Sequence, residues 1–413
     1  MTTEMSQART PLCADNDVHS NQAPEKWEST CGYVTYMDGF VWKYNSSKTI
    51  DLRGVLFGAC TSASVLRTWS LARGCFLTWI LSGACFVLFL NIGNAEAKKI
   101  DAAHMKELVL DFHQMCTFLL GFFISSCLAR WWAIRQDGIG GLWGNLDDIC
   151  MIINALYPSS KKVRDQVLRW GILSHELMYM QAIGTEGESE LGELVKRGLL
   201  LQEELSVIKD LNSKPQVVWA WMCHFFVHLA YGKPENGGST MPSPATLLPQ
   251  LLGFACKARD AVGLLFTLTD SQLPFRYVHF LATIVWLHNF FQAIASAIIM
   301  EQHLANTDYS GVVTELVFLL TYPMLFLGLL HLGEGMLNPM RSASDVDYPR
   351  SAFTYYMRKE NETFFKSTEV DSGAPESSNW RKGLLYERDD KEWTPTWKGK
   401  PSERQTAEQT GNF

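Results

Sequence analysis

The sequence lacks most of the features by which soluble enzymes and nucleic-acid-binding proteins are identified. Only 19% of the 413 residues are charged and the net charge is −7, so the chain offers no basic stripe to a phosphate backbone. The ten cysteines include no Cys-x-x-Cys pair, which argues against a disulfide framework. A Walker loop, a Gly-x-Ser-x-Gly motif and a paired-carboxylate arrangement are all missing. We therefore expect no nucleic acid partner and no enzyme activity.

The apolar residues, 47% of the chain, are concentrated in four blocks. Each block is of the length, about 18 to 24 residues, that crosses the hydrocarbon of a bilayer. The predicted spans are residues 75–93, 112–129, 277–300 and 316–333. A charged turn at residues 98–107 is expected to separate the first two. The pattern predicts an all-α polytopic membrane protein with four transmembrane helices.

The remaining segments are predicted from their composition. Residues 1–49 are polar, carry no signal peptide pattern and are expected to form an N-terminal arm, and residues 50–68 a short interfacial helix. Residues 133–274 return to helical spacing and predict a large soluble insert. Residues 356–413 are rich in Glu, Lys, Ser and Pro and predict a disordered tail. The loop at residues 301–315 contains no Lys or Arg, which places both termini and the insert in the cytoplasm.

The second span carries Gln114, Phe118 and Phe122 at four-residue spacing, on one side of a helix. Two interpretations are open. Aromatic residues at this spacing commonly pack against another helix. If copies of the helix instead surround an axis, rings of phenylalanine form an apolar constriction that tolerates anions at the positive ring edges.

Three other patterns contain residue types that are found in metal, phosphate or calcium sites. His224 and His228 share a helix face but lack further ligands at a suitable spacing for a metal. The glycines of residues 138–144 follow a membrane span rather than a strand, so we expect a flexible exit from the bilayer instead of a phosphate loop. After the fourth span, Asn338-Pro339 ends the helix, and acids just beyond it can join the free carbonyl oxygens around calcium.

Several of these motifs together resemble the bestrophin family of anion channels. The similarity is carried by Phe118-Leu-Leu-Gly-Phe122, the following Arg130-Trp131-Trp132, and Glu334 with Asn338-Pro339 after the last span. It extends over about residues 50–355, through the cytoplasmic helices, and defines the expected channel domain.

The resemblance implies a homopentamer with a central pore and two constrictions. The neck falls on Gln114, Phe118 and Phe122, where glutamine replaces an aliphatic residue, and the cytoplasmic aperture falls on Thr246. Calcium ligands are implied at Gly335 and Asn338. Asp345 and Asp347 are the carboxylates near these two residues. The family has a more acidic segment at this place, so we expect calcium binding to be weakened or lost.

These observations predict a channel that conducts chloride, and bicarbonate with it, passively through a phenylalanine-lined neck, with calcium as its candidate regulator. We expect a multi-pass protein of the plasma membrane or an organellar membrane, in contact with lipid. Two alternatives stay open: a membrane-anchored metalloenzyme using His175, His224 and His228, and a non-conducting membrane scaffold.

Overall fold

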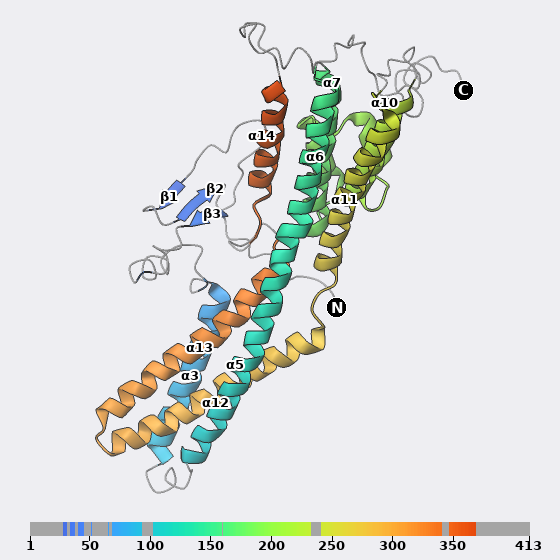
Figure 1. Cartoon of the computed structure of the whole chain (residues 1–413). Helices are drawn as coiled ribbons and strands as arrows, with labels where there is room; N and C mark the ends of the chain where they lie inside the picture. Colours follow the sequence, from blue (N-terminus) through green and yellow to red (C-terminus); the bar gives the residue numbers. More distant parts are fainter. Residues whose placement is uncertain are drawn as a thin grey trace.

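The computed structural model describes residues 28–30, 34–37, 40–44, 51, 65, 68–92, 102–158, 160–232, 241–340 and 347–368. Helices account for most of this part of the chain and form two adjoining bundles (Figure 1). The predicted all-helical, four-span architecture is confirmed.

Four helices are long and apolar enough to cross a membrane. They are α3 (Trp69–Ile92), α5 (Ala102–Ala133), α12 (Phe275–Ala305) and α13 (Tyr309–Leu337). Each begins before the predicted span, because polar residues at its start are already helical. The charged turn expected at residues 98–107 is therefore wrong from Ala102 onward, where α5 begins.

Helix α12 lies at the centre of the membrane bundle. In its most apolar stretch 61% of the residues are buried, against 22% in α3 and in the segment containing α5, and 28% in α13. The other three helices thus pack around α12 and leave apolar surface uncovered within one chain. Such surface is unfavourable in water, as expected for helices that cross a membrane.

The second bundle is built from the predicted insert and a C-terminal helix. Its long helices are α6 (Gly140–Leu156), α7 (Lys161–Ile183), α10 (Lys214–Tyr231) and α11 (Pro244–Asp270), with short α8 (Glu188–Lys196) and α9 (Gln202–Ile208) between them. Trp170, Trp219 and Phe226 are fully buried in its core. Gly184 ends α7 in the left-handed conformation, with φ of 77°, which is typical of a glycine directly after a helix.

The flexible exit predicted at residues 138–144 is wrong. Helix α5 passes through the π-helical segment η2 (Ile134–Ile139) directly into α6, so the chain is helical from the membrane bundle into the second bundle (Figure 1). The glycines serve packing instead: a Cβ on Gly141 would lie 3.0 Å from the Cβ of Ala261 in α11. Small residues at this position let α6 and α11 approach closely.

The tail predicted from residue 356 begins too early. Helix α14 (Arg350–Thr368) packs on α6 and α7, and its Phe353, Met357 and Asn361 are buried. The segment is polar on average, which favours disorder, but its apolar residues recur at helical spacing and form one buried face. Residues 369–413, and most of the predicted interfacial helix at 50–68, lie outside the described residues.

A small antiparallel sheet occurs in the segment predicted to be an extended arm. It consists of β1 (Glu28–Thr30), β2 (Val34–Met37) and β3 (Phe40–Tyr44), in the order β1-β2-β3. Glu28 pairs with Tyr36, and Val34 pairs with Tyr44. This sheet is a local addition to the helical fold.

Candidate ion pathway

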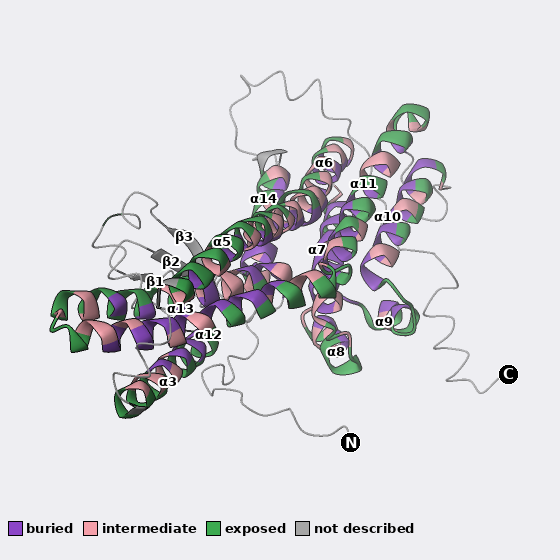
Figure 2. Cartoon of the chain, turned by 90° about the horizontal axis from the view of Figure 1, so that it is seen from below, coloured by how far each residue is buried: buried purple, intermediate pink, exposed green. Residues whose placement is uncertain are grey.

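The three residues predicted to form a neck lie on one exposed face of α5. Phe118 is 66% exposed, Phe122 is 63% exposed, their ring centroids are 5.6 Å apart, and Gln114 is exposed one turn earlier. Figure 2 shows how exposed and buried residues divide along the helices of this bundle. The face is therefore free to contact something outside this chain.

The opposite face of α5 is fixed to the bundle. Its buried residues follow the spacing of one helix face: Cys116, Leu120, Phe123 and Cys127. The Cys116 thiol lies 3.7 Å from the carbonyl oxygen of Ile284 in α12. A Cβ on Gly333 of α13 would lie 2.1 Å from the Phe123 ring, so this glycine admits the aromatic side chain. Such packing sets the rotation of α5 and hence the direction of Phe118 and Phe122.

The chemistry of the exposed face differs from that of a surface built only for lipid. Gln114, Thr117 and Ser125 share it with the two phenylalanines. An amide in hydrocarbon without a partner is unfavourable, whereas beside water it carries no such penalty. The mixture of phenylalanine rings and polar side chains suits a narrow passage in contact with water.

Tyr348 joins the chain beyond the last span to the end of α5. Its hydroxyl donates to the carbonyl oxygen of Trp131 at 2.6 Å, and its ring lies 4.9 Å from the Trp131 ring. This contact lies directly before the π-helical turns of η2, where the regular i→i+4 bonding of the helix changes. Burial raises the pKa of Tyr348, so its hydroxyl stays protonated and able to donate. No motif in the sequence indicates this contact.

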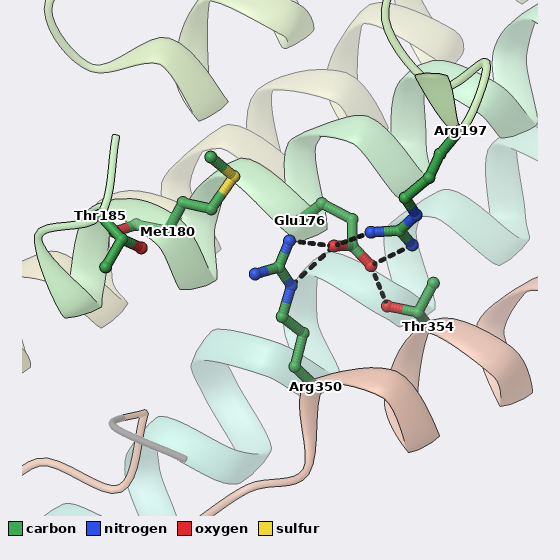
Figure 3. Close-up of polar contacts among 6 residues, drawn as sticks. All are labelled: Glu176, Met180, Thr185, Arg197, Arg350 and Thr354. Carbon is green, nitrogen blue, oxygen red and sulfur yellow. Dashed lines mark hydrogen bonds and ion pairs between the residues drawn. The ribbon is translucent and has the colours of Figure 1, made fainter. Parts of the chain in front are cut away.

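A buried carboxylate secures the start of α14 (Figure 3). Glu176 of α7 accepts from Arg197 Nη1 at 3.1 Å, from Arg350 Nε at 2.6 Å and from Thr354 Oγ1 at 2.7 Å. Burial alone would raise the pKa of Glu176, but Arg350 and Arg197 lower it to about 2. The carboxylate is therefore charged at neutral pH and links α7, the turn after α8 and α14.

The predicted cytoplasmic aperture, Thr246, is exposed in the first turn of α11. This turn is at the end of α11 opposite to the one that leads into α12, so Thr246 is well separated from Gln114 (Figure 1). The structure of one chain thus places the neck and the aperture residues in different bundles.

The predicted calcium ligands are only partly described. Gly335 lies in the last turn of α13, Asn338 caps that helix, Asp347 is buried, and Asp345 lies outside the described residues. The Asn338 side-chain oxygen accepts from the Met340 amide at 3.2 Å. Calcium takes about six to eight oxygen ligands. The candidates among the described residues, Gly335, Asn338 and Asp347, do not make up such a set.

The histidines of the metalloenzyme alternative do not form a metal site. His224 is exposed on α10 and His228 is half-buried, whereas His175 is fully buried on α7 beside Tyr179. Within the described residues no three His, Cys, Asp or Glu side chains lie together as metal ligands would. The metalloenzyme alternative therefore has no site in this part of the chain.

Comparison with known proteins gives a consistent result. The family described as "Bestrophin, RFP-TM, chloride channel" matches residues 68–348. Bestrophin homolog 14 of Caenorhabditis elegans is 23% identical over 239 residues, which cover 55% of this chain and 55% of that protein. The chain thus matches about half the length of this curated relative.

Solved structures share the fold. A bacterial bestrophin homolog from Klebsiella pneumoniae superposes with a TM-score of 0.57 at 16% identity, covering 71% of this chain and 98% of that one. A crystal structure described as a membrane protein gives a TM-score of 0.57 at 15% identity, over 72% of this chain and 99% of that one. At these identities the likeness establishes the fold alone.

Proposed function

We propose that this chain, which belongs to the bestrophin family, conducts chloride through a pore lined by α5. The family is described as a chloride channel family. The observation that carries the proposal here is the exposed face of α5. Gln114, Phe118 and Phe122 are exposed along it, while its other face packs against α12 and α13.

An oligomer supplies what one chain lacks. One copy of α5 cannot enclose a passage. In addition, α3, α5 and α13 expose apolar side chains that are unfavourable in water and that neighbouring subunits would cover. We propose a homopentamer arranged around α5, so that five copies of Phe118 and Phe122 form successive apolar rings. Dewetting between such rings closes a pore, and the positive ring edges favour anions when it is wet. Bicarbonate, a small anion, is proposed as a second permeant ion.

The decisive experiment is the purified protein in a planar bilayer under a chloride gradient. An anion channel gives a reversal potential that follows the chloride gradient. A reversal potential that follows the cation gradient would overturn the proposal. Complete absence of current over a range of calcium concentrations would favour the non-conducting scaffold instead.

The neck assignment has its own test. Replacing Phe118 and Phe122 by alanine should increase the open probability or the leak current, because the apolar constriction is removed. The matched control is Phe76→Ala on α3, since Phe76 is also exposed, at 59%, but on a different helix. Unaltered currents in the double variant, or an equal change in the control, would contradict the assignment.

Calcium dependence stays a prediction. Of the two carboxylates predicted to bind calcium, the structure describes Asp347, which is buried near the carboxyl end of α13. Currents measured with calcium and then with a chelator, for the unmodified chain and for Asp347→Asn, test it. Equal currents under all four conditions would show that calcium does not regulate this channel.

A further inference from the structure

The membrane bundle contains a line of buried polar side chains that the proposed pore does not use. On α12 it consists of His288, Asn289, Gln292 and Ser296, all between 0% and 4% exposed, and Glu315 of α13 continues it. Residues four apart share a helix face, and eight residues span about 12 Å of α12. Polar groups inside a membrane are unfavourable and usually serve a function.

The line is partly hydrogen-bonded. Gln292 Nε2 donates to Ser296 Oγ at 2.8 Å, and Ser296 Oγ lies 3.5 Å from Glu315 Oε2. Lys106 of α5 and His303 of α12 interact with Glu315, and both belong to the end of the bundle opposite to α6. In the orientation proposed for the channel this end faces outward. The line thus leads from the outer end of the bundle toward its middle.

Its inner end has unfilled hydrogen-bonding groups. His288 Nδ1 lies 3.2 Å from Asn289 Oδ1, while His288 Nε2 and Asn289 Nδ2 are buried and have no hydrogen-bond partner. Either assignment of the ring tautomer and the amide leaves one donor and one acceptor unfilled. A water molecule supplies both, and buried water is the usual partner for such groups. The inner end of the line is therefore built for water.

His288 faces the pore-lining helix. Its ring centroid is 5.7 Å from that of His113, which directly precedes Gln114 on α5, and α13 contributes Tyr322 at 6.3 Å. The third neighbour, α3, packs along α12; its charged residue is Arg73, and its thiols are Cys75 and Cys85. No carboxylate from these three helices is in hydrogen-bond contact with His288 within the described residues.

We propose that His288 is a proton-binding site reached from the outer solution along this line, and that its charge changes anion conduction in the neck. A proton from an outer hydronium ion passes along water and the polar side chains to the imidazole, and a water molecule is left in solution. The positive charge then lies beside His113, the residue that precedes Gln114 on α5. A cation near an anion pathway raises the local anion concentration. Outer acidification should therefore increase the chloride current several-fold.

The first test does not depend on conduction. Exchange of the imidazole C2 hydrogen for deuterium, followed by peptide mass spectrometry, reports for each histidine whether water and protons reach the ring. Exposed His224 is the positive reference. We expect pH-dependent exchange at His288, slowed by Gln292→Leu but not by Thr283→Val. Thr283 is the matched control because it lies on the exposed face of α12.

The second test uses the bilayer, because the link to conduction rests on the proposed function. Outer acidification should increase current in the unmodified channel and in Thr283→Val, but not in His288→Gln or Gln292→Leu. A protected His288 that does not exchange, or equal pH responses in all four proteins, would overturn the inference. Absence of current at every pH would overturn the proposed function instead, and the exchange result would still decide whether protons reach His288.

Discussion

The carboxylate of Glu176 offers the sharpest test of how the segment beyond the last span is attached. Replacing Glu176 by Gln keeps the shape but removes the charge that faces Arg197 and Arg350. The Glu176 side chain is 1% exposed and the two arginines are 19% and 29% exposed. The arginines therefore lose their counter-ion in surroundings where water replaces it only partly, and breaking such a buried ion pair commonly costs about 3 to 5 kcal/mol.

The pKa of Glu176 gives an independent magnitude. It falls from 4.5 to about 2 because the attraction of Arg350 and Arg197 outweighs burial. A shift of this size corresponds to about 3 kcal/mol of differential interaction. A lowered folded-state pKa stabilises the fold fully above pH 4.5, and the contribution is lost as the pH falls from there toward about 2.

Amide hydrogen exchange in α14 measures this loss directly, because α14 opens only when the contacts of Arg350 and Thr354 with Glu176 are broken. About 3 kcal/mol predicts exchange on the order of a hundredfold faster in Glu176→Gln at neutral pH. The ratio to the unmodified chain should shrink toward about pH 3, where the unfolded carboxyl is already protonated.

The matched control for this experiment is Glu193→Gln. Glu193 pairs with Lys196 at 3.2 Å on the surface of α8, and the lysine side chain is 76% exposed. Surface pairs of this kind contribute little, so exchange in α14 should change by less than about twofold. Equal exchange in Glu176→Gln and the unmodified chain, or a ratio that does not depend on pH, would refute the reasoning.

Two further predictions concern packing and the π-helical junction. A Cβ on Gly171 of α7 would lie 2.4 Å from the Leu146 side chain. Gly171→Ala should therefore lower the free energy of unfolding of the second bundle by about 1 to 3 kcal/mol, as measured with denaturant. Gly192 has open space around it, so the control Gly192→Ala should be neutral or stabilising. Tyr348→Phe removes the donor to the Trp131 carbonyl while keeping the ring contact. It should speed amide exchange around η2 by about tenfold, for a loss of about 1 to 2 kcal/mol, and unchanged exchange there would contradict the structural role of this bond.

The sequence was sufficient for the membrane bundle because apolar length is a local property. A run such as residues 316–333 must be helical in lipid whatever its neighbours are, since its backbone groups have no other partner. The same logic placed Phe118 and Phe122 on one face of a helix. It did not reveal which face would be exposed, because this depends on Cys116, Leu120 and Phe123 meeting α12 and α13.

The incorrect predictions share a physical cause. Both concern segments whose local composition favours a loop or a tail, namely residues 138–144 and the residues after 356. Their conformation depends instead on contacts with residues distant in the sequence. Gly141 lies in a continuous helix at a close approach to Ala261 of α11, and α14 is attached through Arg350 and Thr354 to Glu176, more than 170 residues earlier. No pattern within one segment records such contacts.

The continuity of α5, η2 and α6 bears on how the two bundles act together. A flexible exit at residues 138–144 would let the neck and the second bundle move independently. A continuous helix instead links the rotation of α5 to that of α6, and the π-helical turns of η2 between them are where the two rotations can differ. Tyr348 contacts the chain directly before those turns, and α14 secures the same segment to α7 through Glu176. The chain beyond the last span is thus positioned to bias the rotation of α5, the helix that carries the proposed neck.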